Sequence, residues 1–295
     1  MTILVIGSSG QLGKCLYDKL YKIEEEVIFI NRAQLDVCSL EAIINIFKLY
    51  NPTIVINASA YTLVDDAEDN AYTANLINNI AVKNIADQCF IFGSKLIHFS
   101  TDYVFDGKAS VPYKEDSKIN PISIYGKTKY YGEEAIKKSN CQYLIFRTSW
   151  VFSEYGNNFL KTILKHGSNK EELNIVADQF GCPTYAQDIA ISIRHIIISI
   201  KKTDFESGIY NYCGDDICSW HDFAIHIFHY AAQINIKVPN KIFEIKSSEF
   251  KTKAPRPMFS ALDCSKLNCE YGLTPSDWKK GLISSIDKLV LNNEI

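Results

Sequence analysis

Apolar and polar positions follow one another in blocks along this chain, and the blocks predict strands and helices by turns. Short apolar runs have the length of buried strands, and polar or small residues follow each of them. Longer stretches between these runs carry apolar side chains three and four positions apart, as in helices packed on a sheet. The predicted strands are residues 2–6, 27–30, 54–56, 96–99 and 143–147, and the predicted helices are residues 14–21, 71–92 and 125–138. This alternation predicts an α/β protein with a doubly wound, Rossmann-like parallel sheet.

After residue 150 the pattern is less regular. It predicts a helix at residues 187–198, a strand at 208–212, a helix capped by Ser219 and a closing helix at 278–290. The chain contains no repeat, low-complexity segment or flexible linker, so we expect a smaller α/β substrate-binding lobe interleaved with the first. The predicted dinucleotide-binding domain is residues 1–150 plus roughly 186–214, and the predicted lobe is roughly residues 151–185 and 215–295.

Composition narrows the class of protein. The 295 residues are 47% hydrophobic and 22% charged, which is ordinary for a soluble protein, and a net charge of -3 gives no reason to expect a nucleic acid or an acidic membrane surface as partner. The nine cysteines are scattered without metal-binding spacing, so reduced thiols are expected. No apolar run approaches a membrane span, and we expect a cytoplasmic protein.

The first predicted strand leads directly into a glycine turn. Gly7, Gly10 and Gly13 stand around Gln11 and Leu12, where the chain passes into its first helix. Glycines allow a tight turn and let the backbone approach a pyrophosphate at the positive end of that helix. The sequence therefore predicts a dinucleotide site at the start of the chain.

The end of the second strand predicts which dinucleotide is bound. NAD-binding folds usually place Asp or Glu here, about 20 residues past the glycine turn. This chain has Asn31 and Arg32 instead, so no carboxylate would repel a 2′-phosphate and a cation is at hand. The sequence favours NADPH over NADH, although Arg32 could also be simply solvated. Asp36 and Val37 follow where adenine would lie.

The candidate chemistry lies between residues 100 and 129. Thr101 follows the apolar run 96–99, and Tyr125 and Lys129 are one turn apart on one face of a predicted helix. A free phenol keeps its proton to about pH 10, and an adjacent ammonium favours the phenolate. Tyr125 is thus predicted as proton donor, Lys129 as the group that lowers its pKa, and Thr101 as the group that holds a carbonyl oxygen. The same spacing also arises by chance on exposed helices, so the preceding strand and the glycine turn are what favour catalysis.

Two other features have competing interpretations. Arg256 lies in a stiff Pro-Arg-Pro segment, and its guanidinium would suit a diphosphate, but an idle exposed arginine explains the sequence equally well. His221, His226 and His229 lie on an amphipathic helix without a supporting carboxylate pattern, so we predict no metal site there.

Taken together, the motifs resemble those of the extended short-chain dehydrogenase/reductases over nearly the whole chain. The resemblance rests on residues 10–13, 57–62, 100–107, 125–129 and 147–151, and it continues through 157–159, 178–181 and 256–257. It implies reduction of the C4 ketone of a dTDP-linked 4-dehydro-sugar by NADPH or NADH, with Lys129 also binding the nicotinamide ribose. It places Asp102, Trp150 and Asn158 with Thr101 and Arg256 at the substrate, and Gly10, Gln11, Leu12, Asp36, Val37, Ala58, Ala60 and Tyr61 at the cofactor.

The chain departs from the family's pattern at a few positions. Some members carry glutamates that bind Mg²⁺ between subunits where this chain has Cys15 and Gln187, so a bridging metal is open and a monomer or a homodimer is expected. Ser59 replaces a more usual alanine, and both side chains are small.

Two other functions are compatible with the sequence, one of them enzymatic and the other non-catalytic. One is another sugar-nucleotide enzyme of this fold, namely an epimerase, a dehydratase or a related ketoreductase, although Thr101 is followed by Asp102 and Tyr103 rather than by the Asp and Glu of the dehydratases. The other is a non-catalytic subunit resembling the regulatory subunit of methionine adenosyltransferase. An intact set of Thr101, Tyr125 and Lys129 argues against a mere scaffold.

Overall fold

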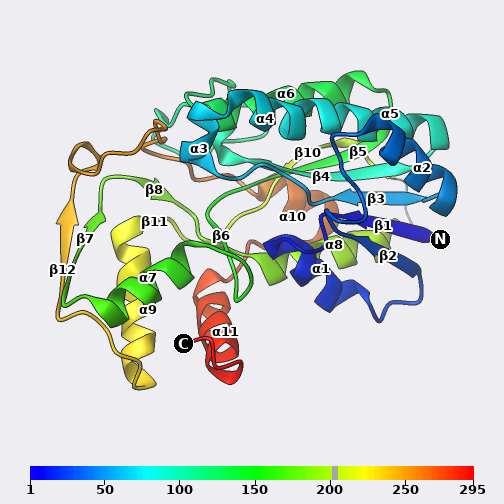
Figure 1. Ribbon diagram of the computed structural model, residues 1–295. Helices are drawn as coiled ribbons and strands as arrows, with labels where there is room; N and C mark the ends of the chain where they lie inside the picture. Colours follow the sequence, from blue (N-terminus) through cyan, green and yellow to red (C-terminus); the bar gives the residue numbers. More distant parts are fainter. Residues whose placement is uncertain (201–204) are drawn as a thin grey trace.

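The computed structural model describes residues 1–200 and 205–295, and its centre is a six-stranded sheet in the order β10-β5-β4-β3-β1-β2. Every neighbouring pair in this sheet is parallel, which confirms the predicted doubly wound α/β fold (Figure 1). The strands are β1 (Thr2–Ile6), β2 (Glu26–Ile30), β3 (Ile54–Asn57), β4 (Lys95–Thr101), β5 (Gln142–Thr148) and β10 (Gly208–Asn211). The chain passes from β1 outward to β2 and then back to β3 on the other side of β1. This reversal creates a switch point between β1 and β3, where open α/β sheets bind ligands.

Helices cover both faces of the sheet because successive side chains of a strand point to opposite faces. Ile3 and Val5 pack with one set of helices, and Leu4 and Ile6 pack with the other. The first set contains α1 (Gln11–Leu20), α8 (Ala186–Ser199) and α10 (Ser265–Tyr271), and the second contains α2 (Leu40–Tyr50), α5 (Ala81–Phe92) and α6 (Ile124–Lys138) (Figure 1). Because helices cover both faces, the strands are apolar on both faces, and this explains their continuous apolar runs in the sequence.

The predicted helix at residues 71–92 is interrupted. The structure has α3 (Val64–Asp69), α4 (Ala71–Asn75), a π-helical turn (Leu76–Ile80) and then α5. The π-helical turn points the side chain of Asn78 inward, where it bonds Tyr61 N and O and Thr128 Oγ1. A wider turn inside a helix is common near functional sites, and this one joins the segment after β3 to α6.

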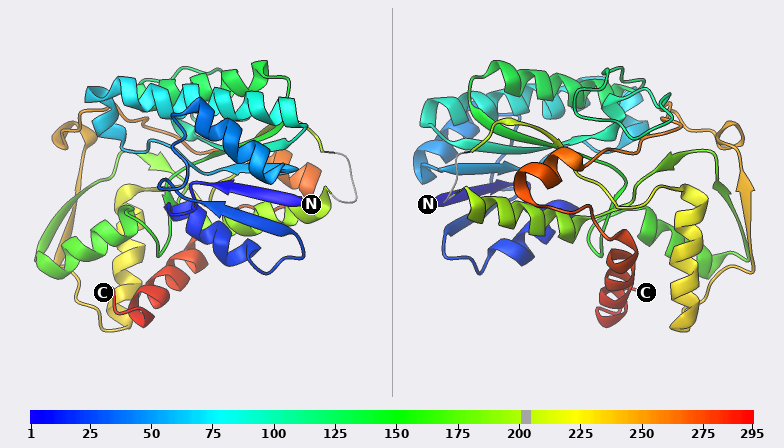
Figure 2. Two further views of the ribbon diagram at one scale, coloured as in Figure 1. Left: turned by 45° about the vertical axis from the view of Figure 1, so that its right-hand side comes forward. Right: turned by 180° about the vertical axis from the view of Figure 1, so that it is seen from behind.

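A second lobe packs around its own hydrophobic core beside the sheet (Figure 2). Phe223 and Ile227 of the predicted apolar helix face are buried there together with Trp278, and Tyr230 packs at the margin. The lobe contains α7 (Phe159–Asn169), α9 (Trp220–Gln233), α11 (Trp278–Leu291) and the parallel pair β7 (Glu172–Val176) and β12 (Lys241–Ile245). Short strand pairs join it to the rest, namely β6 (Val151–Phe152) with β9 (Thr184–Tyr185), and β8 (Phe180–Gly181) with β11 (Cys218–Ser219).

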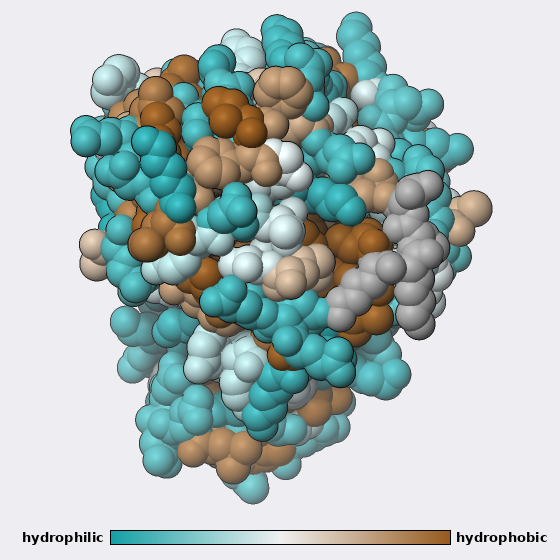
Figure 3. All heavy atoms as spheres, turned by 90° about the vertical axis from the view of Figure 1, so that its right-hand side faces the viewer, coloured by the Kyte–Doolittle hydropathy of each residue, from teal (hydrophilic) through white to brown (hydrophobic). Residues whose placement is uncertain are grey.

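The strands of the sheet run from right to left in Figure 1, so their carboxyl ends face the second lobe. The opposite face, where the strands begin, carries mostly hydrophilic side chains with small hydrophobic patches between them (Figure 3). No helix within residues 1–200 or 205–295 is long and apolar enough to cross a membrane. Parallel α/β sheets bind their ligands at the carboxyl ends of the strands, so the candidate site lies at the edge that faces the second lobe.

Candidate active site

Thr101 and Tyr125 come together because α6 packs directly on the end of β4. Thr101 is the last residue of β4, and Ser123 caps α6 by accepting from Gly126 N. A Cβ atom on Gly126 would lie 2.2 Å from the carbonyl oxygen of Tyr103, so only glycine allows this approach. The close contact brings the first turn of α6 to the end of β4, at the carboxyl edge of the sheet.

Tyr125 presents a neutral phenol beside Thr101. Its ring is partly buried and packs edge-on against Tyr103, with centroids 5.7 Å apart. Burial raises the pKa of Tyr125, and a hydrogen bond with Thr101 lowers it only in part. The phenol is consequently a proton donor rather than a phenolate in this state.

Lys129 lies one turn further along α6 and is almost fully buried. Its Nζ donates to the carbonyl oxygen of Phe99 at 2.6 Å and lies 3.4 Å from Nε2 of His98. Burial lowers the pKa of Lys129 to about 8, opposed by the charge of Glu133. The expectation that Lys129 lowers the pKa of Tyr125 is not met here: the amine is directed toward β4, and burial dominates the pKa of the phenol.

Asp102 follows Thr101 in a 3₁₀ turn and is buried. Its Oδ1 accepts the Thr101 hydroxyl at 3.0 Å. Burial raises the pKa of Asp102 to about 7, although hydrogen bonds with Ser260 and Thr101 oppose the rise. Asp102 thus belongs to the same group as Thr101 and Tyr125, and near neutral pH it can either donate or accept a hydrogen bond.

The other predicted substrate residues lie along a large cavity or next to it. The cavity has a volume of about 730 Å³ and lies between α7, β7, β12 and the start of α9. Trp150 stacks on Trp220 with centroids 3.4 Å apart and has φ +46°, a strained value for a bulky residue and one typical of functional sites. Arg256 also lines the cavity, and its Nη2 donates to Asp65 Oδ2 at 2.8 Å. The side chains around the cavity include Phe159, Asn174, Gln179, Trp220 and Arg256.

Asn158 departs from the prediction. Its Oδ1 caps α7 by accepting from Lys161 N at 3.2 Å, and its Nδ2 donates to Gln11 Oε1 at 2.9 Å and to the carbonyl oxygen of Ser153 at 2.8 Å. Its polar atoms are engaged within the protein, so the structure gives Asn158 an internal role and no free group for substrate. Gln11 in turn donates to the carbonyl oxygen of Val151 at 3.1 Å, so this pair ties α1 to the second lobe.

The glycine turn fits a pyrophosphate. Gly7 has φ +86°, and a Cβ there would lie 2.8 Å from Ser59 N. A Cβ on Gly13 would lie 2.2 Å from the oxygen of Gly7. Gly10 precedes α1 without a side-chain cap, so the amides at the start of this helix are free to bind an anion. The turn meets Ala58 and Ser59 at the end of β3, which is the switch point of the sheet.

The remaining cofactor residues surround this turn. Asn31 begins the loop after β2, where its Oδ1 accepts from Ala33 N at 2.9 Å, and Arg32 is exposed beside it. The Tyr61 hydroxyl donates to Asp66, which raises the pKa of the phenol. The other predicted positions are Leu12, part of α1, Asp36 and Val37 after β2, and Ala58 and Ala60 after β3. The set fits a dinucleotide, and no carboxylate follows β2 directly.

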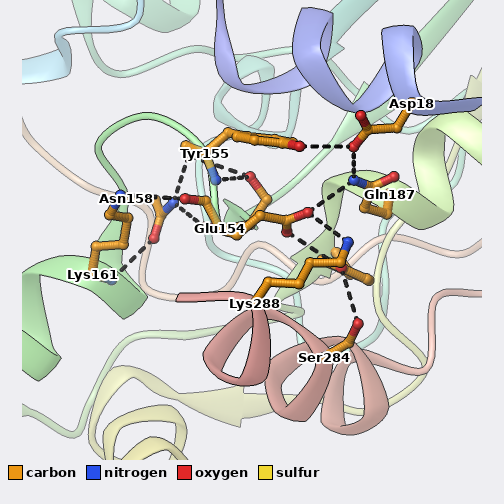
Figure 4. Close-up of polar contacts among 10 residues, drawn as sticks. Asp18, Glu154, Tyr155, Asn158, Lys161, Gln187, Ser284 and Lys288 are labelled. Carbon is orange, nitrogen blue, oxygen red and sulfur yellow. Dashed lines mark hydrogen bonds and ion pairs between the residues drawn. The ribbon is translucent and has the colours of Figure 1, made fainter. Parts of the chain in front are cut away.

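A divalent metal does not fit the positions where the resemblance places one. Gln187 Nε2 donates to Glu154 Oε1 at 2.9 Å and to Asp18 Oδ2 at 2.6 Å, and Lys288 Nζ donates to the same Glu154 oxygen at 2.6 Å (Figure 4). Burial raises the pKa of the Cys15 thiol to about 12, and Mg²⁺ prefers oxygen ligands to sulfur, so Cys15 is a poor replacement for a glutamate ligand. A lysine cation already neutralises Glu154. Within the described residues no three His, Cys, Asp or Glu side chains are grouped to hold a metal.

The three histidines that the sequence places on one helix all belong to α9. His226 packs edge-on against Trp278, with centroids 5.2 Å apart, and His229 bonds Gln233 at 3.0 Å. His221 lies 3.8 Å from Glu244. Each histidine has its own separate neighbour.

Sequence reasoning missed two buried polar groups behind the site. Glu133 bonds Arg147 through both carboxylate oxygens, at 3.0 and 2.7 Å, and accepts the Ser100 hydroxyl. His98 lies between Asn57 and Lys129. The signal was present, because His98 and Arg147 are polar side chains within or at the end of apolar strand runs.

The fold and the arrangement at its carboxyl edge are those of an extended short-chain dehydrogenase/reductase. Residues 1–291 match the family described as the RmlD substrate binding domain, and the chain belongs to that family. It is 39% identical to the dTDP-4-dehydrorhamnose reductase of Aggregatibacter actinomycetemcomitans, over 95% of this chain and 96% of the relative. It is 34% identical to the enzyme of that name from Escherichia coli K12 over the full length of both.

Solved structures agree with these relatives. The dTDP-4-dehydrorhamnose reductase of Clostridium acetobutylicum superposes with a TM-score of 0.91 at 36% identity, covering 98% of this chain and 100% of that one. The enzyme of that name from Bacillus anthracis, solved with NADP, gives 0.90 at 35% identity, covering 97% and 99%. A Thermus thermophilus UDP-glucose 4-epimerase with NAD gives 0.80 at 17% identity over 97% and 98%, which shows the shared fold alone.

Proposed function

We propose that this protein reduces the C4 ketone of dTDP-4-dehydro-L-rhamnose to dTDP-L-rhamnose with NAD(P)H, the last step of dTDP-rhamnose biosynthesis. The observation that carries the proposal is the meeting of Thr101 and Tyr125 at the carboxyl edge of the sheet, the same edge at which β1, two strands away, leads into the glycine turn. Full-length relatives named for this activity support it. The epimerase likeness, at 17% identity, supports only a common fold.

The residues of the chain account for the proton chemistry. Thr101 holds the substrate oxygen by a hydrogen bond, and the neutral phenol of Tyr125 donates its proton to that oxygen as negative charge develops. The bound nicotinamide supplies the hydride. Lys129 lies one turn from Tyr125 and binds the ribose next to the reacting ring. Asp102, buried beside Thr101, orients the sugar.

NADPH is the proposed cofactor. A carboxylate that would repel the 2′-phosphate is missing directly after β2, and the exposed Arg32 supplies a positive charge. The NADP in the Bacillus anthracis structure agrees with this choice. We expect a lower KM for NADPH than for NADH, and equal or better use of NADH would refute the preference.

The nucleotide part of the substrate is assigned to the second lobe. The cavity of about 730 Å³ is in the size range of small-ligand sites. Its wall includes Trp220, on which Trp150 stacks, and the Arg256 guanidinium, which is paired with Asp65. The proposed domains are residues 1–150 plus roughly 186–214 and, for the lobe, roughly 151–185 and 215–295. Two separate hydrophobic clusters support this division, except that α10, within the proposed lobe, packs on the sheet through Leu267.

Catalysis is proposed to proceed without Mg²⁺, in a cytoplasmic monomer or homodimer. The Glu154, Gln187 and Lys288 network supports metal independence. All nine cysteines are free thiols, which agrees with a reducing compartment.

The test is NADPH oxidation followed by absorbance with dTDP-4-dehydro-L-rhamnose, alongside GDP-linked and UDP-linked ketosugars. Turnover with the dTDP sugar at a kcat/KM at least about 10-fold above the others is expected, because base and sugar contacts each discriminate by 1 kcal/mol or more. Purified protein carrying stoichiometric, tightly bound NAD and no net oxidation of NADPH would instead identify an epimerase or dehydratase.

A further inference from the structure

His98 is a fully buried imidazole in the middle of β4, just behind the site. Buried ring nitrogens need hydrogen-bond partners. Asn57 Nδ2 lies 3.2 Å from Nδ1 of His98, and Lys129 Nζ lies 3.4 Å from Nε2. Asn57 and His98 are register partners on β3 and β4, so the sheet itself sets this contact. The imidazole connects the end of β3 with the active-site lysine.

The amide of Asn57 fixes the tautomer of His98. Asn57 Oδ1 accepts the backbone N–H of Ser59 at 3.1 Å and its hydroxyl at 2.6 Å. A backbone N–H can only donate, so the amide oxygen faces Ser59 and the amide NH₂ faces His98. Nδ1 of His98 therefore accepts, and in the neutral ring the proton is on Nε2. Burial, assisted by the charge of Lys129, holds the pKa of His98 well below its usual value, so the ring is neutral.

An Nε2–H donor distinguishes between the two forms of Lys129. An ammonium has three donors and no acceptor, whereas a neutral amine can accept the Nε2–H while still donating to the carbonyl oxygen of Phe99. The neutral amine satisfies both neighbours, and the ammonium satisfies only one. The other titratable neighbours are Tyr125 and Glu133, one turn to either side on α6, and the Glu133 carboxylate is paired with Arg147.

We propose that His98 is a positioning residue for the reduction: its Nε2–H, held in place by Asn57, donates to Lys129 and stabilises the neutral amine of that lysine. The inference rests on the proposed role of Lys129. The hydrogen bonds with His98 and Phe99 hold the amine against β4, so His98 sets the pH at which Lys129 loses its charge and NADPH binding and turnover decline. The Tyr125 phenolate that forms when the sugar oxygen takes its proton regains a proton from solvent, and no electrons are transferred in that step.

The first test is the pH profile of kcat for NADPH oxidation in the wild type, His98→Leu and His98→Gln. Leucine removes the donor, so the ammonium becomes more favourable and the alkaline limb of the profile moves up by about one pH unit, a tenfold change in the ionisation constant of the lysine. Glutamine keeps an N–H donor, so its limb is expected within about 0.3 units of wild type. His195→Leu, an exposed histidine on α8, is the matched control and leaves the profile unchanged.

An unmoved alkaline limb in folded His98→Leu would overturn the proposal. If that variant does not fold, Asn57→Leu replaces it: the amide that fixes the tautomer is lost, Nε2 is free to accept from the ammonium, and the limb moves up again. A limb that stays in place in Asn57→Leu overturns the proposal equally.

A second measurement is independent of the sugar. The Kd of NADPH is followed by fluorescence from pH 7 to 10. It is expected to rise as Lys129 loses its charge, and this rise should occur at a higher pH in His98→Leu than in wild type. This binding profile separates the two hypotheses: absence of turnover with every ketosugar refutes the proposed function, whereas an unmoved binding profile refutes the role of His98.

Discussion

At the scale of single residues, we expect substitution of Tyr125 to lower the rate of reduction more than any other single change. We expect Tyr125→Phe to lower kcat at least about 100-fold, because general-acid catalysis contributes that much or more, while the Kd values of NADPH and of the sugar nucleotide change little. Stopped-flow NADPH oxidation and equilibrium titration measure the two quantities. Tyr131→Phe, a half-exposed tyrosine on the same helix, is the control. Turnover of Tyr125→Phe near the wild-type rate would remove the assignment.

The buried charge of Lys129, which the proposed function needs, lowers the free energy of unfolding. Its pKa falls from 10.5 to about 8 on folding, so below pH 8 the folded protein bears the full cost of a buried charge. Between pH 8 and 10.5 the unfolded chain holds a proton that the folded protein has lost, so the free energy of unfolding rises with pH.

Replacing the charge should therefore stabilise the protein. We expect Lys129→Met to be more stable than wild type by about 2 kcal/mol at pH 7, after allowance for the lost bond to Phe99, and to lose NADPH binding and turnover. Urea unfolding at pH 7 and 9.5 measures the difference, which should shrink at the higher pH. Lys127→Met, exposed on the same helix, should show no such pH dependence. Equal loss of stability at both pH values would contradict the prediction.

The sequence predicts some of these residues and not others for a geometric reason. Tyr125 and Lys129 are predictable because a four-residue spacing on one helix brings side chains together without knowledge of the fold. The contact of His98 with Asn57 depends on the register of β3 against β4, which no local pattern encodes. The direction of the Lys129 side chain is likewise a property of packing, so its assumed effect on the pKa of Tyr125 was wrong for this state.

At the scale of elements, the glycine turn offers a matched pair of substitutions. A Cβ on Gly13 would lie 2.2 Å from the oxygen of Gly7, whereas a Cβ on Gly93, with φ +67°, meets nothing within 4 Å. We expect Gly13→Ala to weaken NADPH binding at least about 10-fold, because the turn must open. Gly93→Ala should cost about 1 kcal/mol of stability through its backbone conformation alone and leave the Kd of NADPH unchanged. Fluorescence titration and thermal unfolding of both variants measure this contrast, and equal NADPH affinities would contradict it.

Local pattern predicts the elements and fails where distant contacts modify them. Residues 71–92 have helical periodicity, yet a π-helical turn widens the helix at Leu76–Ile80 so that Asn78 can reach Tyr61 and Thr128. The pairing of β7 with β12 joins segments on opposite sides of α8 and α9 and leaves no local signal. Helix caps are local, and the cap predicted at Ser219 is confirmed, where it forms a capping box with Asp222.

At the scale of the whole molecule, the carboxyl edge of the sheet and the second lobe meet through polar contacts that cross between them. Gln11 with Asn158 joins α1 to the segment before α7, and Asp18 with Tyr155 does so two turns further along α1, at 3.0 Å. The parallel sheet was predictable because apolar runs alternate with helices. The joining contacts were not, because each depends on how the chain returns from the lobe to the sheet.

The ion pair of Lys288 with Glu154 provides the test at this scale. Glu154 is 1% exposed and Lys288 is 38% exposed, so removal of the lysine leaves a buried carboxylate without its cation. Burial lowers the pKa of Lys288, but Glu154 and Tyr185 raise it more. Wherever Glu154 is ionised, the pair therefore stabilises the fold fully below the ordinary pKa of lysine, and this stability is lost only as the pH rises above that value. We expect Lys288→Met to cost about 3 kcal/mol at pH 7, the lower end for a broken buried pair.

Whether the protein needs a metal can be tested by comparing wild type with Lys288→Met. Because Lys288 supplies the positive charge that a divalent ion would otherwise provide, neither EDTA nor millimolar Mg²⁺ should change the melting temperature or the turnover of the wild type. Lys83→Met, which breaks an exposed pair with Asp87, is the control and should change stability by less than about 0.5 kcal/mol. Loss of wild-type activity in EDTA, restored by Mg²⁺, would show that a metal binds despite the lysine. In Lys288→Met the buried Glu154 carboxylate has lost its cation, so a Mg²⁺-dependent rise in melting temperature is expected in this variant alone.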